Sequence, residues 1–254
     1  MGKIIAIANQ KGGVGKTTTA VNLSACLGAQ NKRTLLIDID PQGNSSSGLG
    51  VDARRAKLST YDCLIDGASM KEAAIKTDYK NLWICPSNIN LAGAELELAA
   101  KDKREYCLKN AINEVKDDYD FIIIDCPPSL GLITLNSFTA ADSVLVPIQC
   151  EYYALEGLSQ LTNTIKIIKR SLNPDIAIEG VLLTMFDSRT NLSIQVVDEV
   201  KKYFGKKVYK TVIPRSVRLA ESPSFGQPII EYDPRSKGAE GYINLTKEVI
   251  KNNK

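Results

Sequence analysis

The chain has 254 residues, 44% of them hydrophobic and 24% charged, a composition that excludes collagen-like, low-complexity and disordered proteins. It contains no histidine, which excludes His-based catalytic triads and His-ligated metals, and its six cysteines form no C-x-x-C pair. The first residues, MGKIIAIANQKGG, do not resemble a secretory signal sequence, and no stretch of 18 apolar residues occurs. We therefore expect a cytoplasmic protein without a membrane span.

Short β-branched stretches alternate with longer helical patterns along the chain, and several of the short stretches are apolar throughout, as in strands covered on both faces. Strands are predicted at residues 4–8, 34–38, 82–86, 121–125, 143–148, 180–185 and 208–212. Helices are predicted at residues 17–29, 154–172, 191–204 and 239–252. The alternation predicts a doubly wound α/β fold with a mostly parallel sheet and helices on both faces. No change in composition marks a boundary, so we predict one domain over residues 1–254.

The strongest motif is Lys11-Gly12-Gly13-Val14-Gly15-Lys16-Thr17-Thr18, which follows a predicted strand and begins a predicted helix. In this context glycines let backbone N–H groups point at phosphate oxygens, and the N-terminal end of the helix adds positive potential. We predict that Lys16 neutralises the β- and γ-phosphates, that the Thr17 hydroxyl binds Mg²⁺, and that Thr18 contacts the α-phosphate.

The loop departs from the pattern G-x-x-x-x-G-K-[ST] because Gln10 occupies the position of the first glycine, and a second lysine, Lys11, precedes Gly12. A lysine at this position cannot easily fold back onto its own nucleotide. We expect it to reach a nucleotide held by a second subunit. The alternative interpretation is a solvated lysine without a role.

Two further motifs place acids at the ends of buried strands. Asp38 and Asp40 leave one strand on the same side, near the phosphate loop, where one can orient a water and the other can support Mg²⁺. The sequence Phe121-Ile-Ile-Ile-Asp125 has the form of a Walker B strand, and Asp125 is predicted to hold the metal directly or through water. The alternative for Asp38 and Asp40 is that they are ordinary acids that cap the end of a strand. The alternative for Asp125 is an acid at the N-terminus of a helix, which Ser129 could also cap.

Residues 43–50 (GNSSSGLG) are predicted to be the most flexible loop, at the carboxyl edge of the sheet where ligands bind. Charge is uneven as well. The net charge of the chain is +3, but residues 187–218 hold eight Lys or Arg and three acids. This local excess indicates a surface that faces a polyanion, unless it is an ordinary solvated face.

The segments KGGVGKT (11–17), DIDPQG (38–43) and IIIDCPP (122–128) resemble the deviant Walker A ATPases of the MinD/ParA superfamily. From residue 2 to about residue 250 the chain resembles the ParA/Soj branch, the chromosome- and plasmid-partitioning ATPases. The resemblance implies that Lys11 acts across a nucleotide-sandwich homodimer, and that a side chain at Gly12 would block close approach of the two subunits.

The same resemblance implies roles for other residues. Asp40 would position the hydrolytic water, so that Lys11, Lys16 and Asp40 form the catalytic set. Thr17, Asp40 and Asp125 would lie at the Mg²⁺. The adenine would be framed by Met185 and the segment Ile213-Pro214-Arg215, and DNA phosphates would be contacted by Arg189 and Arg218.

The implied function is a Mg²⁺-dependent ATPase for DNA segregation on the nucleoid. Its ATP-bound homodimer would bind double-stranded DNA non-specifically and release it on hydrolysis, which a ParB/Spo-type centromere-binding partner would stimulate. We expect slow intrinsic hydrolysis, because no residue obviously acts as a strong base. The steep dependence of non-specific binding on phosphate contacts predicts strong salt dependence.

The alternatives are a MinD-like membrane-associated positioning ATPase, an iron–sulfur scaffold or nitrogenase-like reductase, and a bacterial tyrosine kinase. A MinD-type chain would end in a basic amphipathic helix. Here Tyr242, Leu245 and Val249 form a stripe that we expect to pack on the core, so no membrane partner is predicted. The cysteine spacing does not suit a cluster, and no tyrosine-rich tail is present.

Overall fold

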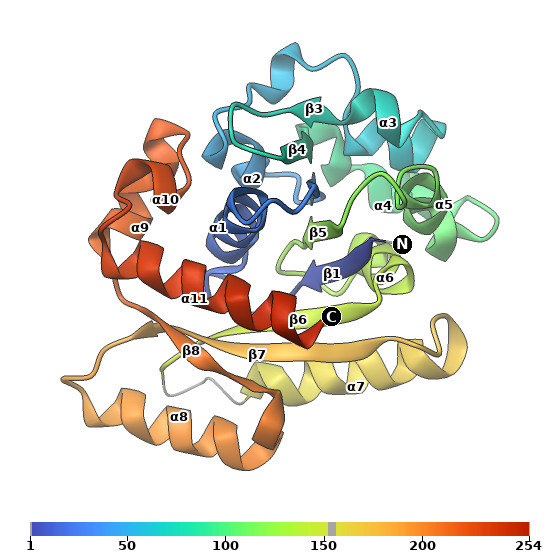
Figure 1. Cartoon of the computed structure of the whole chain (residues 1–254). Coiled ribbons are helices and arrows are strands. Elements are labelled where there is room, and N and C mark those ends of the chain that lie inside the picture. The colour runs from blue at the N-terminus through green and yellow to red at the C-terminus, as the bar shows by residue number, and fades with distance from the viewer. Residues whose placement is uncertain (1, 152–155, 254) are drawn as a thin grey trace.

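The structure, a computed structural model, describes residues 2–151 and 156–253. Its centre is one eight-stranded sheet in the order β3-β4-β2-β5-β1-β6-β7-β8 (Figure 1). Neighbouring strands are parallel except for the antiparallel pair β3 and β4 at one edge. The strands are β1 (Lys3–Ile7), β2 (Thr34–Asp38), β3 (Ile75–Lys76), β4 (Leu82–Cys85), β5 (Phe121–Asp125), β6 (Ser143–Gln149), β7 (Ala177–Phe186) and β8 (Val208–Pro214).

The central strands are buried on both faces, as their apolar sequences predict. Every residue of β2 and β5 is buried, because helices cover the sheet on each side. The predicted strand positions are confirmed to within a few residues, and the doubly wound, mostly parallel fold is confirmed. The two-residue strand β3 was not predicted, because it is too short to produce a periodic pattern.

Helices form a layer on each face of the sheet (Figure 1). One face carries a core shared with α1 (Lys16–Ala29), α9 (Val217–Glu221), α10 (Ile229–Tyr232) and α11 (Lys237–Asn252). The other face carries a core shared with α3 (Met70–Ala73), α4 (Ala94–Ala99), α5 (Cys107–Asn113), α6 (Leu132–Ala140), α7 (Glu156–Ser171) and α8 (Asn191–Phe204). Short 3-10 and π turns connect several of these elements.

The C-terminal helix α11 packs on α1 and β8. Tyr242, Leu245 and Val249 are each at most 1% exposed, so the predicted apolar stripe is part of the core. No helix among the described residues is both long and apolar enough to cross a membrane. The predicted helix at 191–204 is confirmed, whereas the predicted start of the preceding helix at Ala154 lies outside the described residues.

The strand order of the sheet reverses direction at β1. β1 lies between β5 and β6, and the chain moves to one side of β1 through β2 and to the other side through β6 to β8. In open α/β sheets, ligands bind at such a reversal, beyond the carboxyl ends of the strands. The loop from β1 to α1 and the acids that follow β2 and β5 therefore meet at one place.

Candidate functional site

The loop that joins β1 to α1 has the backbone of a phosphate-binding loop. Gly15 is the N-cap of α1 and has φ 88°, in the left-handed region that favours glycine. The Val14 carbonyl accepts a hydrogen bond from Thr184 Oγ1 of β7 at 2.9 Å, so the loop is anchored to a second strand. Helix α1 thus begins at Lys16 with its free N–H groups directed toward the loop.

Lys16 lies inside this loop. Its Nζ donates a hydrogen bond to the carbonyl of Lys11 at 3.1 Å, and the residue is only 7% exposed. Burial lowers the pKa of the Lys16 ammonium, while the nearby Asp125, Cys126 and Asp40 raise it and offset part of that effect. A poorly solvated cation at the N-terminus of a helix is suited to hold a phosphate.

Asp38 and Asp125 face one another across neighbouring strands, in register at the ends of β2 and β5. Both are fully buried, and burial is the main cause that raises the pKa of Asp38 to about 8 and that of Asp125 to about 6. Their mutual repulsion raises the pKa of Asp38 further, whereas hydrogen bonds from Ser45 and Thr17 lower that of Asp125. The pair therefore retains protons to unusually high pH.

The carboxylate oxygens of Asp125 are suited to bind Mg²⁺. Asp125 Oδ2 accepts a hydrogen bond from Ser45 Oγ at 2.8 Å, but its buried Oδ1 has no hydrogen-bond partner in the part of the chain that the structure describes. The described residues contain no group of three or more Cys, Asp or Glu side chains that would hold a metal alone. Mg²⁺ commonly binds one or two carboxylates and completes its shell with substrate phosphates and water, which matches this arrangement.

The alternative interpretation of Asp125, as an acid at a helix N-terminus, is wrong. Helix α6 begins at Leu132 and its N-cap is Gly131, six residues beyond Asp125. Ser129 provides a carbonyl that accepts a hydrogen bond from Thr134 Oγ1 instead of capping with its side chain. Asp125 thus ends a strand next to the phosphate loop, as in a Walker B strand.

The prediction of a flexible loop at residues 43–50 is wrong. Residues Asn44–Gly48 form helix α2, and Ser45 and Ser46 are buried because they donate hydrogen bonds to Asp125 and Asp38. Sequence analysis also missed Ser87, whose hydroxyl donates to the carbonyl of Asp40. The serine-rich segment beside the paired acids is a signal that could have indicated the hydrogen bonds of Ser45 and Ser46, but not that of Ser87.

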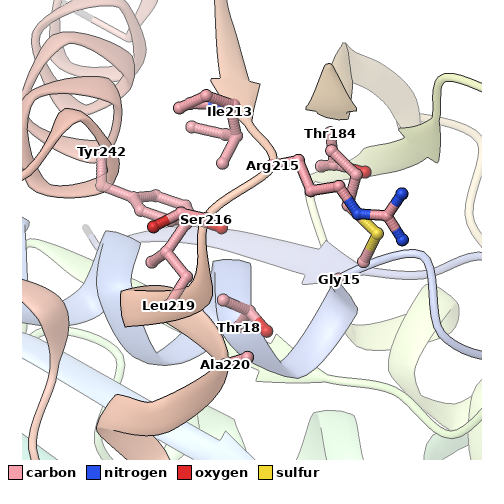
Figure 2. Close-up of a pocket in the computed structure, with 11 residues that line it drawn as sticks. Gly15, Thr18, Thr184, Ile213, Arg215, Ser216, Leu219, Ala220 and Tyr242 are labelled. Atoms are coloured by element: carbon pink, nitrogen blue, oxygen red, sulfur yellow. The ribbon is translucent and has the colours of Figure 1, made fainter. Parts of the chain in front are cut away.

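The predicted adenine residues line one cavity of about 270 Å³ beside the phosphate loop (Figure 2). Met185, Pro214 and Arg215 border it together with Gly15 of the loop and Thr18 of helix α1. Ile213, which was predicted with them, also lines the cavity, and the lining residues that sequence analysis missed are Thr184, Ser216, Leu219, Ala220 and Tyr242. The wall is largely apolar, which suits a flat aromatic ligand.

The backbone of Lys11 belongs to the phosphate loop, and its ammonium lies near an acid that follows β6. Its N–H donates to Asn9 Oδ1 at 3.0 Å, and Asn9 Nδ2 donates to the carbonyl of Pro147 at 2.7 Å. The Lys11 ammonium lies 3.9 Å from Glu151 Oε2, and both side chains are partly exposed. A Cβ built on Gly12 meets nothing within 4 Å among residues 2–151 and 156–253, so the described part of the chain leaves space beside Gly12.

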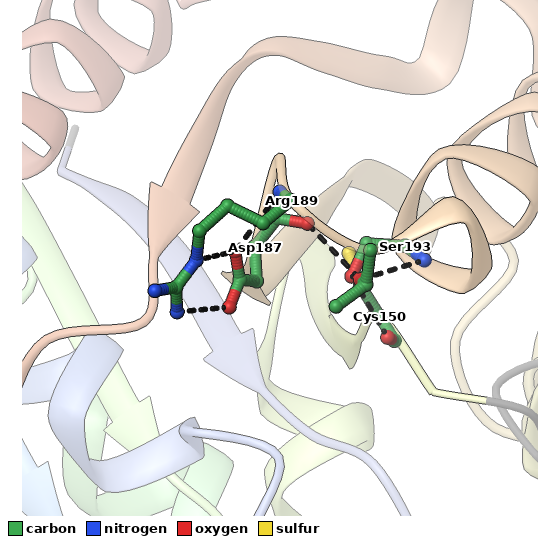
Figure 3. Close-up of polar contacts among 5 residues, drawn as sticks. Cys150, Asp187, Arg189 and Ser193 are labelled. Carbon is green, nitrogen blue, oxygen red and sulfur yellow. Dashed lines mark hydrogen bonds and ion pairs between the residues drawn. The ribbon is translucent and has the colours of Figure 1, made fainter.

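The two arginines predicted to contact DNA are exposed, and each is paired with an acid. Arg189 binds both carboxylate oxygens of Asp187, at 2.9 and 2.7 Å, which lowers the pKa of Asp187 to about 2 (Figure 3). Arg218 lies 3.2 Å from Glu221 and 3.5 Å from Asp233. These partners were not predicted, although Asp187 lies only two residues before Arg189.

We expect the metal-free protein to lose stability as pH rises from about 4 to about 8. Unfolded aspartate ionises near pH 3.8, whereas Asp38 and Asp125 keep their protons to about pH 8 and 6 in the folded protein. The folded state binds more protons in this window, so the free energy of unfolding falls as pH rises. Urea denaturation in EDTA should show a shallower fall between pH 6 and 8 for Asp38→Asn, which cannot titrate.

The control for this measurement is Asp118→Asn, which changes an exposed carboxylate paired with Lys71. Its curve should run parallel to that of the unmodified protein. A pH-independent difference in unfolding free energy between Asp38→Asn and the unmodified protein would contradict the raised pKa.

The fold and the site define a P-loop nucleotide-binding protein, and comparison with known proteins gives its family. A family model described as an AAA domain matches residues 2–178. The chain is 62% identical to sporulation initiation inhibitor protein Soj of Bacillus subtilis (strain 168), over 99% of this chain and all of that protein. It is 55% identical to chromosome partitioning protein ParA of Myxococcus xanthus (strain DK1622), over 99% and 89% of the two chains. The chain belongs to the ParA/Soj family of chromosome-partitioning ATPases.

Solved structures share the fold. One, described as cobyrinic acid a,c-diamide synthase from Mycobacterium smegmatis with bound ADP and magnesium, has a TM-score of 0.87 and 39% identity. The similarity covers 99% of this chain and 95% of that chain. A protein of the same fold and a related sequence thus holds a nucleotide and Mg²⁺ together.

Proposed function

We propose that this chain is a DNA-segregation ATPase that hydrolyses ATP to ADP and phosphate with Mg²⁺. The observation that carries the proposal is the convergence of Lys16, Asp40 and Asp125 at the end of β1, while the ammonium of Lys11 pairs with Glu151. A self-contained nucleotidase needs no second lysine in its loop, and a partly exposed ammonium is available to a second subunit.

The residues take distinct roles in this proposal. The P-loop N–H groups, Lys16 and Thr18 bind the phosphates, and Thr17 and Asp125 hold Mg²⁺, which neutralises phosphate charge. Asp40 orients the attacking water and also supports the metal. Thr17, Asp40 and Lys16 are brought together at the N-terminus of α1, where Asp40 and Lys16 interact electrostatically.

The same proposal covers dimerisation, DNA binding and the release of DNA. Lys11 of each subunit contacts the triphosphate held by the other subunit, so that only the ATP form is a tight homodimer. The dimer presents Arg189 and Arg218 of both subunits to double-stranded DNA on the nucleoid. Hydrolysis, stimulated by a ParB-type centromere-binding protein, removes the γ-phosphate contacts and releases the DNA. Residues 1–254 act as one domain, which the single sheet from β1 to β8 supports.

Sedimentation with ATP, ADP or no nucleotide, each with and without duplex DNA, tests the proposal. We expect dimers only with ATP and Mg²⁺, and DNA that sediments only with those dimers. A protein that remains monomeric in ATP, or that binds DNA equally well with ADP, would contradict it.

Two other functions are less well supported. A MinD-like membrane anchor requires a free apolar face on the C-terminal helix, whereas Tyr242, Leu245 and Val249 of α11 are buried against the core. The activity named for the M. smegmatis protein belongs to a chain of 39% identity, below the 62% and 55% of the partition relatives. We carry over from it only the nucleotide and the metal.

We expect the acid beside Arg189 to weaken DNA binding. Arg189→Ala should lower the affinity of the ATP-bound dimer for DNA and reduce the salt slope by less than one per arginine lost, because the Asp187 carboxylate that Arg189 leaves takes up a cation and offsets part of the counterion release. Asp187→Asn should raise the affinity a few-fold, because a neutral partner leaves the guanidinium free for phosphate. DNA binding measured by fluorescence anisotropy at several salt concentrations checks both, and dimerisation should not change.

The chain offers a matched control pair. Arg54 binds Asp52 through the same two-residue spacing, at 2.9 Å, and is equally exposed, but it lies outside the basic stretch. Arg54→Ala and Asp52→Asn should leave DNA affinity unaltered. If both pairs changed the affinity equally, the effect would reflect overall charge and not contact at Arg189.

A further inference from the structure

Ser87 is a fully buried residue next to the acids of the site, two positions beyond the end of β4. Its N–H donates a hydrogen bond to Ser46 Oγ at 3.1 Å, and its hydroxyl donates to the carbonyl of Asp40. Ser46 donates from its N–H and its hydroxyl to Asp38 Oδ2, at 2.8 and 2.7 Å. One serine therefore links the end of β4 to both acids at the end of β2.

The other hydrogen bonds of Asp40 lie within residues 38–43, and one of them runs from the Asp40 N–H to Asp38 Oδ1 at 3.3 Å. Asp40 Oδ1 accepts a hydrogen bond from the N–H of Gln42 at 3.0 Å, and its carbonyl accepts one from the N–H of Gly43 at 2.9 Å. Both donors belong to the turn itself, so they move with it. Among the described contacts of Asp40, Ser87 is the hydrogen-bond donor that comes from a different strand of the sheet.

Ser87 is itself fixed from its other side. The carbonyl of Pro86 accepts a hydrogen bond from the N–H of Thr60 at 2.8 Å, and Asn88 Nδ2 donates to Ser59 Oγ at 2.8 Å. Thr60 and Ser59 are buried, so the segment that carries Ser87 is held between the turn at residues 40–43 on one side and these two residues on the other. Such a donor can set the position of Asp40 without touching the nucleotide.

We propose that Ser87 is a positioning residue for ATP hydrolysis, which fixes the turn at residues 40–43 so that the Asp40 carboxylate holds the attacking water in line. The inference rests on the proposed function, in which Asp40 orients that water. A displacement of about 1 Å in a reacting group can lower a rate by about 100-fold, so the loss of one fixed contact has a measurable effect on turnover.

The test compares Ser87→Ala and Ser87→Cys with the unmodified full-length chain. Cysteine keeps the shape of serine and replaces a strong donor by a weak one. Phosphate release with ATP, Mg²⁺ and duplex DNA gives kcat and KM, and sedimentation gives ATP-dependent dimerisation. We expect kcat to fall about tenfold in both variants, with KM, nucleotide affinity and dimerisation within about twofold of the unmodified protein.

Ser47→Ala is the matched control. Ser47 is exposed on α2, and its hydroxyl donates a hydrogen bond to the carbonyl of Asn44 within the same helix. It should hydrolyse ATP at the unmodified rate. A normal kcat in Ser87→Ala and Ser87→Cys would overturn the inference. A loss of nucleotide affinity equal to the loss in kcat would also overturn it, because that result indicates a general structural role.

Asp40→Ala measured in parallel separates the inference from the proposed function. A variant that dimerises with ATP but does not turn over supports the role of Asp40, and Ser87 is then judged on its own result. If Asp40→Ala turned over normally, the role of Asp40 in the proposed function would be wrong and the inference would fall with it. If only the Ser87 variants turned over normally, the inference alone would be wrong.

Discussion

Replacement of Lys16 by alanine is expected to lower the affinity for ATP by about 100-fold, the range expected for a hydrogen bond to a charged group. Lys16 is the buried cation at the N-terminus of α1, and it already lies close to the acids that would surround the metal. Without it, the phosphate charge has no counter-ion inside the loop. Isothermal titration with ATP and Mg²⁺ measures the loss directly.

The same substitution should not destabilise the nucleotide-free protein. Burial lowers the pKa of Lys16, which means that its charged form is held at a cost in the empty loop. Thermal unfolding without nucleotide should therefore occur at an unchanged or higher temperature, and Lys247→Ala, on the exposed side of α11, should behave like the unmodified protein. Unchanged affinity for ATP in Lys16→Ala would contradict the assignment of the phosphate loop.

Replacement of Lys11 by alanine is expected to abolish ATP-dependent dimerisation and DNA retention while the affinity for ATP persists. The Lys11 ammonium pairs with Glu151, so we expect its removal to leave the phosphate site of one subunit intact. The opposite patterns of Lys11→Ala and Lys16→Ala make each variant the control for the other. Sedimentation and isothermal titration on the same samples distinguish them.

Gly12→Val gives an independent check on the same interface. Because a Cβ at this position meets no described atom within 4 Å, a larger side chain is expected to fit in one subunit and to interfere with a second subunit that approaches it. A monomer that still binds ATP is the expected result. If Lys11→Ala and Gly12→Val both formed dimers that retained DNA, the protein would be an ordinary self-contained nucleotidase.

The parts of the fold that could be predicted are those whose signal is local. The strand Phe121–Asp125 and the helix Asn191–Phe204 occur where they were predicted, because apolar continuity and helical spacing determine them within a few residues. The phosphate loop could be placed for the same reason, since its glycines and lysine are adjacent in the sequence. The interaction of Lys16 with Asp40 and Asp125 also follows from the ends of neighbouring parallel strands.

The parts that could not be predicted depend on long-range contacts. Helix α2 has a serine- and glycine-rich sequence typical of a loop, and it is ordered by hydrogen bonds to Asp38 and to Asp125, the latter 80 residues from Ser45. Ser87 lies 47 residues from Asp40, and no pattern in the sequence relates them. The pairing of Asp187 with Arg189 is a local contact, because the two residues are two positions apart in the sequence. Sequence analysis nevertheless counted Asp187 only as part of the charge of residues 187–218.

The pairing of Arg189 with Asp187 changes how ionic strength will act on the complex with DNA. An arginine that reaches a phosphate displaces a condensed cation from the duplex, but the abandoned Asp187 then attracts a cation from solution. The cation taken up at Asp187 offsets the cation released from the DNA. A plot of affinity against salt will therefore count fewer contacts than the dimer makes, and the full number will emerge only where that carboxylate has been neutralised.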